Sequence, residues 1–246
     1  MNEYRADKIR NIALIGHSSS GKTSLAEALL FNTGATTRLG KVDDSNTVSD
    51  FDAEEQRRKI SISTSVVPCE WNGYKINVID TPGYIDFAGE MKGALRVADC
   101  AVILVDAVAG IEVGTELVWQ YCEELNLPRV IYINKMDREN ADFFRVLDQL
   151  RERYGKSIAA LQLPIGKESA FKGEVNVVNC KAFIGKNEGE IPADLQDAVD
   201  ERRTQLVEIA AESNDELIEK YFATGELSDE EIRVGLEHGV AGGTLV

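Results

Sequence analysis

The chain has 246 residues, of which 43% are hydrophobic and 28% charged, so it can bury a sizeable core and is not disordered throughout. Its 27 basic and 42 acidic side chains leave a net charge of −15, which argues against binding nucleic acid through bulk positive charge; we expect no DNA partner. The four cysteines form no CxxC pair, and the sequence shows neither a signal peptide nor a membrane-spanning run. These features predict a cytoplasmic protein with reduced thiols and no membrane partner. We also expect a monomer, although none of these features bears on the oligomeric state.

The chain opens with the pattern of a parallel α/β unit. An almost unbroken apolar run over residues 9–16 predicts a buried strand, and apolar residues at helical spacing predict a helix over residues 22–31. Residues 34–59 contain few large apolar side chains and are too many for an ordinary connection, so we expect this stretch to be functional, mobile or both.

Further strands and helices continue this pattern. Strand-like runs at 60–71 and 74–80 are joined by Asn72-Gly73, a dipeptide typical of a type I′ turn, which predicts an antiparallel hairpin. Other expected strands cover 101–106 and 129–134, and the expected helices cover 113–125 and 143–154.

The pattern changes after about residue 161. Residues 162–184 contain short strand-like pieces with glycine turns, and residues 193–237 form an acidic helical section. Two helix starts are expected at capping boxes, which are Ser213 with Glu216 and Ser228 with Glu231; Leu227 and Ile232 would add a hydrophobic staple to the second. We therefore predict an α/β fold, with a mostly parallel sheet flanked by helices and an inserted or appended α+β subdomain.

Residues 16–23 match the phosphate-binding pattern GxxxxGK[ST]. Its glycines let backbone amides curl around phosphate oxygens, and the following helix adds the positive end of its dipole. Lys22 would reach the β- and γ-phosphates, while the Thr23 hydroxyl would bind Mg²⁺. The alternative, a glycine turn with an idle lysine, is disfavoured by the position of the motif between a strand and a helix.

Asp80-Thr81-Pro82-Gly83 follows another predicted strand. A carboxylate at the C-terminal end of a parallel strand lies where open α/β sheets bind ligands, so Asp80 could hold Mg²⁺ through water. The amide of Gly83 could sense a γ-phosphate and move when it leaves. By itself an aspartate before a turn is commonplace, but after a phosphate-binding loop it is a strong signal.

Asn134-Lys135-Met136-Asp137 follows a third predicted strand. A carboxylate at Asp137 can accept two hydrogen bonds from guanine, from N1–H and from the N2 amine, which adenine cannot offer. The aliphatic stem of Lys135 can lie along the purine ring, and Asn134 can hydrogen-bond to the polar edge of the purine. Taken alone the tetrapeptide could equally be a turn entering a helix; as the third element in this order it favours a guanine site.

With these motifs, the chain resembles the translational GTPases, specifically elongation factor G and its paralogues. The resemblance covers nearly the whole chain, and residues 161–240 look like the G-prime subdomain of elongation factor G. It implies a P-loop NTPase fold with a GTP-binding domain over residues 1–160, and makes residues 241–246 the start of that domain's final strand, after which the chain stops. The stretches that carry it are NIALIGHSSSGKTSLAEALL, KINVIDTPGYIDFAGE, ALRVADCAVILVDAVAGIEVGTE, PRVIYINKMDRENADF and LQLPIG.

The resemblance also implies GTP or GDP as the nucleotide, with Mg²⁺. It makes residues 34–61 switch I and residues 80–90 switch II. It implies that Thr23, Ser61 and Asp80 hold the metal and that Tyr84, Lys22 and Gly83 serve catalysis. The nucleotide-binding set that it implies is His17, Ser18, Ser19, Ser20, Gly21, Lys22, Thr23, Ser24, Asn134, Lys135 and Asp137.

Several residues depart from the family pattern. Tyr84 replaces the histidine that positions the attacking water, and a phenol cannot become a cation near neutral pH, so we expect slow hydrolysis or a different water geometry. Ser61 replaces a threonine but keeps the oxygen. Ser19 and Ser18 replace an aspartate and an apolar residue, which puts in doubt a monovalent-cation site and one wall of the apolar gate around the water; Ile60 supplies the other wall.

The chain also stops before the family's guanine-capping Ser-Ala loop, so we expect weaker guanine binding.

The expected function is a GTP-hydrolysing switch domain of a ribosome-associated elongation factor, slow in isolation. The alternatives are a GTP-dependent binding module with little hydrolysis and a tetracycline-resistance or ribosome-recycling paralogue; a P-loop kinase or ATPase would leave the 134–137 motif unexplained. The resemblance suggests that Glu208, Glu212 and Asp215 share one helix face and meet the ribosomal stalk protein, although charge runs are usually solvated surface. The basic run Arg57-Arg58-Lys59 could face ribosomal RNA or be merely solvated.

Overall fold

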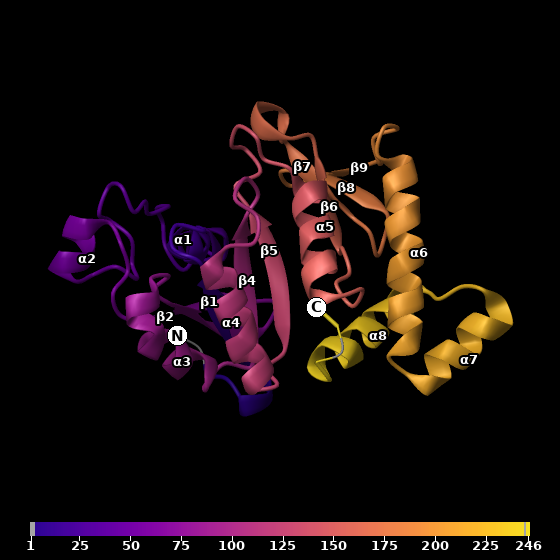
Figure 1. Ribbon diagram of the computed structural model, residues 1–246, viewed down its shortest axis with the longest axis horizontal. Helices are drawn as coiled ribbons and strands as arrows, with labels where there is room; N and C mark the ends of the chain where they lie inside the picture. The colour runs from indigo at the N-terminus through magenta and orange to yellow at the C-terminus, as the bar shows by residue number, and fades with distance from the viewer. Residues whose placement is uncertain (1–2, 244) are drawn as a thin grey trace. The chain divides into compact units, whose positions relative to one another are not determined.

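The computed structural model describes residues 3–243 and 245–246 of the chain. These residues form two compact units, which are described separately (Figure 1). Among the described residues, the first comprises 3–106 and 111–134, and the second 107–110, 135–243 and 245–246. The domain limits expected from the sequence, at residues 160 and 240, stay a prediction.

The first unit is built on a five-stranded sheet with the order β2-β3-β1-β4-β5. Strands β3, β1, β4 and β5 run parallel, and only β2 is antiparallel to its neighbour β3. The predicted mostly parallel α/β sheet is therefore confirmed. The strands are β1 Ile9–Gly16, β2 Ser65–Trp71, β3 Tyr74–Asp80, β4 Cys100–Asp106 and β5 Arg129–Asn134.

Helices cover both faces of this sheet. Helix α1 packs against β1, β2 and β3, where its buried Ala26 and Leu30 meet Leu14, Val78 and Leu104. Because alternate strand residues point to opposite faces, Ala13 and Ile103 face the other side, where α3 contacts β1 and α4 contacts β1 and β4. The helical segments of this unit are α1 Lys22–Asn32, α2 Ala53–Arg58, α3 Ala88–Leu95, α4 Val113–Glu124 and the 3₁₀ turns η1 Ala6–Lys8 and η2 Ile85–Phe87.

The hairpin between β2 and β3 forms as predicted. Asn72 and Gly73 adopt positive φ angles of 47° and 79°, as the two central residues of a type I′ turn must. The first strand of the hairpin is shorter than the sequence suggested, because β2 begins at Ser65 and not at residue 60. The amides of Ile62 and Ser63 donate to the buried Glu55 carboxylate, so they do not serve a strand ladder.

The second unit contains a separate antiparallel sheet of order β6-β7-β8-β9 together with helices α5 to α8. Leu163, Val175 and Ala182 of this sheet pack in one core with Val199 and Leu206. The predicted subdomain with its own sheet is thus confirmed as a feature of the fold. The elements are α5 Phe143–Tyr154, β6 Gln162–Ile165, η3 Glu168–Ala170, β7 Gly173–Asn176, β8 Lys181–Ile184, β9 Asn187–Gly189, α6 Gln196–Glu212, α7 Asp215–Thr224 and α8 Asp229–Ala241.

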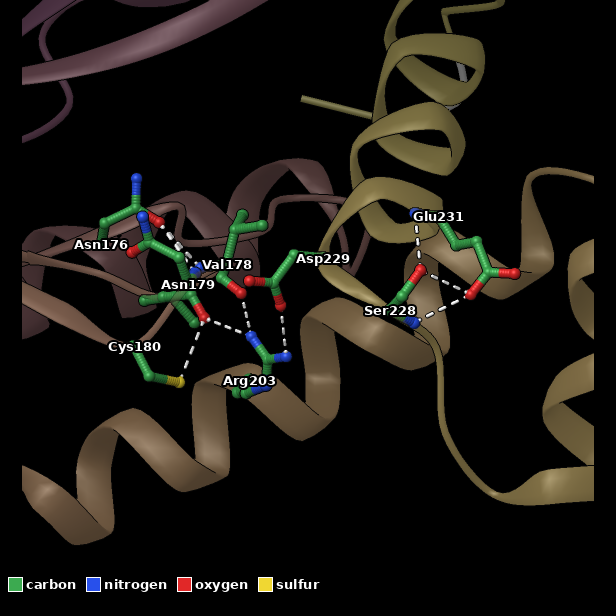
Figure 2. Close-up of polar contacts among 9 residues, drawn as sticks. Asn176, Val178, Asn179, Cys180, Arg203, Ser228, Asp229 and Glu231 are labelled. Atoms are coloured by element: carbon green, nitrogen blue, oxygen red, sulfur yellow. Dashed lines mark hydrogen bonds and ion pairs between the residues drawn. The ribbon is translucent and has the colours of Figure 1, made fainter.

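The side chain of Arg203 on α6 bonds to two other parts of this unit (Figure 2). Arg203 donates to the carbonyls of Val177 and Val178 in the turn after β7. Its other nitrogen lies 2.8 Å from a carboxylate oxygen of Asp229, the first residue of α8. One side chain therefore joins the sheet, α6 and α8.

Two helix starts of this unit were predicted, and one of them was wrong. Ser228 and Glu231 form the expected capping box of α8, drawn in Figure 2. Helix α7 is capped instead by Asn214, whose side chain accepts from the amides of Glu216 and Leu217. The Ser213 hydroxyl donates to the carbonyls of Ala210 and Gly235, so it joins α6 to α8 and does not cap α7.

In the part of the chain that the structure describes, no helix is both long and apolar enough to cross a membrane.

Candidate functional site

The loop between β1 and α1 has the backbone of a phosphate cradle. Gly16, Ser19 and Gly21 adopt φ angles of 145°, 61° and 100°. A Cβ atom at Gly16 would lie 2.5 Å from the carbonyl oxygen of Leu104, so only glycine fits there. Gly21 is the N-cap of α1 and supplies no side-chain cap to its first amides, which leaves the start of that helix suited to an anion.

Lys22 lies in this loop as the motif predicts. Its side chain is buried, and its ammonium donates to the carbonyls of Gly16 at 3.2 Å and His17 at 2.9 Å. Gly83 of switch II approaches closely, because a Cβ atom at Gly83 would lie 2.4 Å from the Lys22 ammonium. The two motifs, 61 residues apart in the sequence (83 − 22), therefore meet around one buried cation.

The other predicted phosphate-loop residues differ in exposure. Ser20 is buried, His17 and Ser18 are partly buried, and Ser19 and Ser24 are exposed. The His17 ring is fixed from two sides. Its Nδ1 accepts a hydrogen bond from the amide of Gly114, and its Nε2 lies 3.4 Å from a carboxylate oxygen of Glu112.

The three predicted metal ligands surround this loop. The hydroxyl oxygens of Thr23 and Ser61 lie 3.1 Å apart although they come from α1 and switch I. Asp80, at the C-terminal end of β3, is 1% exposed, and neither of its carboxylate oxygens has a hydrogen bond of ordinary geometry among the described residues. Burial raises the pKa of Asp80 to about 6, while the nearby Ser49 and Thr23 hydroxyls and the Lys22 charge oppose that rise.

This donor set fits Mg²⁺. The ion prefers hard oxygen ligands, and a buried carboxylate with two unused oxygens gains most from a nearby cation. Among residues 3–243 and 245–246, no group of three or more histidine, cysteine, aspartate or glutamate side chains is placed to hold a metal ion by itself. The oxygen donors that meet here are two hydroxyls and one carboxylate.

The predicted switch I, residues 34–61, adds buried polar residues that were not predicted from the sequence. Thr47, Ser49 and Asp50 are each less than 9% exposed. Burial raises the pKa of Asp50; the Ser61 hydroxyl counters this rise, and the Glu55 carboxylate adds to it. Their only sequence signal is a stretch rich in small polar residues, which does not reveal which of them are buried.

The basic run in switch I is largely engaged within the chain. Arg57 and Arg58 both donate to the Glu54 carboxylate from the exposed face of α2. The Lys59 ammonium donates to the carbonyl of Asp43 at 2.7 Å and also bonds the Ser45 hydroxyl. Much of the local positive charge is therefore paired.

The predicted switch II, residues 80–90, starts at the end of β3 and reaches into α3. Thr81 is fully buried and donates to the carbonyl of Leu14 in β1. Tyr84 is 40% exposed and precedes the short η2 turn, which leads into α3. Glu90 of α3 accepts from the amide of Thr64 at 2.8 Å, which joins switch II to the segment after switch I.

The predicted guanine motif is divided between the two units. Asn134 ends β5 in the first unit, and its side-chain Nδ2 donates to the carbonyl of Ser20 in the phosphate loop at 2.9 Å. Lys135, with a φ of 63°, and the exposed Asp137 belong to the second unit. There the carbonyl of Met136 accepts from the amide of Glu168.

The predicted acidic face is broken in the second unit. Glu208 and Glu212 lie exposed on α6, but that helix ends at Glu212, and Asp215 begins α7. The three carboxylates therefore do not share one helix face, because the chain turns at Ser213 and Asn214. Glu208 and Glu212 border a cavity of about 840 Å³ that is also lined by Arg151, Lys156 and His238.

The strands and the loop together define the class of protein. A parallel sheet whose first strand runs through a glycine-bearing turn into a helix, with a buried lysine and a buried carboxylate at its C-terminal edge, is the framework of a P-loop nucleotide-binding protein. The described geometry brings together residues of the phosphate loop, both switches and Asn134.

The chain belongs to the family described as the elongation factor Tu GTP binding domain, whose model matches residues 7–231. It is also similar to a crystal structure of a protein from Thermus thermophilus, with a TM-score of 0.91 and 36% identity. That match covers 97% of this chain and 36% of the other protein, so this chain spans little more than a third of that protein's length. The chain is thus a GTP-binding domain of the translational GTPase type.

Proposed function

We propose that this chain is the GTP-hydrolysing switch domain of a ribosome-associated translation elongation factor of the elongation factor G type. The observation that carries the proposal is the meeting of Lys22, Thr23, Ser61 and Asp80 around one phosphate loop. A switch requires such an arrangement, because loops on different elements must sense the same phosphate.

Each residue has a distinct part in the proposed reaction. The loop amides and Lys22 would bind the β- and γ-phosphates, and the Gly83 amide would face the γ-phosphate. Thr23 and Ser61 would hold Mg²⁺ directly, with Asp80 supporting the ion through water. The ion would neutralise phosphate charge when bound. Catalysis would consist of positioning and charge neutralisation, with no covalent intermediate.

Guanine selection is assigned to Asn134, Lys135 and Asp137. Asn134 already contacts the phosphate loop through Ser20, so the base and phosphate motifs share a direct link. A carboxylate at Asp137 would accept two hydrogen bonds from guanine and would face adenine without a matching donor pair.

The nucleotide and its turnover can be tested directly. Release of inorganic phosphate from GTP should be slow for the chain alone and should rise when ribosomes are added to the full-length protein. ATP should neither compete for binding nor be hydrolysed. Equal binding of ATP and GTP would contradict the guanine assignment, and ribosomes without effect would contradict the assignment to translation.

A second function, a GTP-dependent binding module that hardly hydrolyses, is favoured by one observation. Tyr84, at the position of the family's water-positioning histidine, is a partly exposed phenol. If the phenol limits the rate, Tyr84→His should accelerate single-turnover cleavage on ribosomes by about tenfold or more, as expected for a restored general acid–base group. Tyr84→Phe is the matched control. An unchanged rate in Tyr84→His would count against this explanation.

The proposed partner of the second unit is the ribosomal stalk protein. Glu208 and Glu212 are exposed one turn apart on α6, so they form a local negative site for a basic partner surface. Arg57, Arg58 and Lys59 remain the proposed contact with ribosomal RNA, which would have to compete with Glu54 for the two arginines.

A further inference from the structure

Switch I is held in place by a buried carboxylate close to Ser61. Glu55 of α2 is 2% exposed. Its Oε1 accepts hydrogen bonds from the amides of Ile62 at 2.9 Å and Ser63 at 3.0 Å, and its Oε2 accepts from the amide of Asp52 at 3.2 Å. The residues immediately after Ser61 are thereby fixed to the helix that precedes it.

A second buried carboxylate holds the earlier part of switch I. Glu27 of α1 is 1% exposed and accepts from the amides of Gly40 at 3.1 Å and Val48 at 2.5 Å. A Cβ atom at Gly40 would lie 2.2 Å from Glu27 Oε2, so a side chain there would displace the carboxylate from this contact. The same helix begins with Lys22 and Thr23, so Glu27 joins switch I to the element that starts the phosphate site.

Burying two carboxylates is costly unless each is well hydrogen-bonded. Both are satisfied by backbone amides between residues 40 and 63, through hydrogen bonds strengthened by the carboxylate charge. Backbone amides that donate to a fixed carboxylate fix the path of the chain, whatever side chains the loop carries. The Ser61 hydroxyl, which lies 3.1 Å from that of Thr23, is the group whose position depends on that path.

We propose that Glu55 and Glu27 are positioning residues, which hold switch I and the two residues after it through backbone amides, so that Ser61 stays beside Thr23 as a Mg²⁺ ligand. This inference rests on the proposed function, in which Ser61 and Thr23 bind the ion. Glu55 acts next to Ser61, and Glu27 acts at the opposite end of the loop. We therefore expect the larger effect from Glu55.

The test measures how Mg²⁺ slows the release of a fluorescent non-hydrolysable GTP analogue from the whole chain. For Glu55→Ala, the Mg²⁺ concentration that gives half of the full slowing should rise about tenfold or more, as for other residues that orient metal ligands. Release without Mg²⁺ should change less than twofold, because Lys22 and the phosphate loop are untouched. Trypsin should also cleave faster after Arg57, Arg58 and Lys59.

Matched variants separate positioning from a general loss of structure. Glu54→Ala removes a neighbouring but only partly buried carboxylate of α2, which bonds Arg57 and Arg58 instead of loop amides, and should leave the Mg²⁺ dependence unchanged. Glu55→Gln keeps one oxygen to accept from Ile62 and Ser63 but places an amide group against the Asp52 amide. It should give a smaller shift than Glu55→Ala while the fold, followed by thermal unfolding, is retained.

The role of Glu27 can be tested separately by changing Gly40, whose amide donates to Glu27. Gly40→Ala should shift the Mg²⁺ dependence in the same direction as Glu27→Ala but by less, because Glu27→Ala also removes the hydrogen bond from Val48. The double variant should be no worse than Glu27→Ala, because both changes disturb the same carboxylate.

Two outcomes would overturn the inference. One is an unshifted Mg²⁺ dependence in Glu55→Ala, and the other is an equal acceleration of release with and without Mg²⁺, which would mean general loosening. A wild-type chain that fails to bind the analogue would instead refute the proposed function.

Discussion

The polar site of the first unit and the acidic helix of the second place their charges in opposite environments. Lys22 and Asp80 are almost wholly removed from solvent, whereas Glu208 and Glu212 are exposed on α6. A buried charge is costly to keep unless it has a partner, so a buried cluster of this kind indicates a ligand. An exposed carboxylate costs little, so its presence says much less about function.

The largest effect should come from distorting the phosphate loop. Gly16→Ala would place a methyl group 2.5 Å from the Leu104 carbonyl at a φ of 145°, so we expect a loss of about 3 kcal/mol or more of unfolding free energy, and loss of GTP binding. Gly34→Ala is the control, because φ there is 75° but no atom lies within 4 Å of the added methyl group. It should cost about 1 kcal/mol. Urea unfolding measures both, and equal losses would show that the clash with β4 does not matter.

A smaller effect of opposite sign should follow removal of the buried charge at Asp80. Its pKa is raised from 3.8 in the unfolded chain to about 6 in the folded chain, so the folded state holds the proton more tightly. This group therefore costs stability as the pH rises from about 4 to 6, and the cost persists above that range. Without Mg²⁺, Asp80→Asn should raise the free energy of unfolding at pH 8 by on the order of 1–3 kcal/mol.

The control for this prediction is the same unfolding measurement at a lower pH. The gain from Asp80→Asn should be smaller at pH 5, where the wild-type carboxyl is largely protonated in the fold. Added Mg²⁺ with GTP should stabilise the wild-type chain more than the variant. A variant that is less stable than the wild type at pH 8 without Mg²⁺ would show that the buried charge is compensated within the protein.

The smallest effect on stability should come from the acidic helix. Glu208→Lys with Glu212→Lys should change the free energy of unfolding by less than about 0.5 kcal/mol, because both side chains are exposed. Stalk-stimulated GTP turnover by the full-length protein should fall, most clearly at low salt, where charge steering is strongest.

Asp215→Lys is the matched control for this face, since Asp215 lies on α7 and not on α6. It should leave stalk-stimulated turnover closer to the wild-type level. Unchanged turnover in the double α6 variant would leave this face as ordinary solvated surface.

Local sequence patterns determined most of the regular elements. The strands β1, β3 and β5 and the helix α5 have the predicted limits, because apolar runs and helical spacing are properties of neighbouring residues. The position of the phosphate loop could be predicted equally well from the sequence. The positive φ angles at Gly16 and Gly21 favour glycine, which the sequence has at both positions.

One predicted helix start was wrong because two neighbouring residues could each cap the helix. Asn214 and Ser213 are both good helix caps, and the contact of Ser213 with Gly235 on α8, 22 residues away, decided between them. Helix α2 was missed although Asp52 and Glu55 have the spacing of a capping box, which they form. The sequence also contains a weak indication of Glu27. It follows the apolar Ala26 in the predicted helix, and both residues are buried in α1.

The sequence by itself determined the kind of chemistry, because glycine, lysine, hydroxyl and carboxylate groups at fixed spacing can bind phosphate, a metal ion and guanine only in a few ways. Only the tertiary structure decided where Ser61 lies, which carboxylates are buried and where the acidic helix ends. These outcomes depend on contacts between distant residues, such as Glu27 with Gly40 and Thr23 with Ser61. The energy of burying a charge is set by what surrounds it, and no stretch of neighbouring residues contains that information.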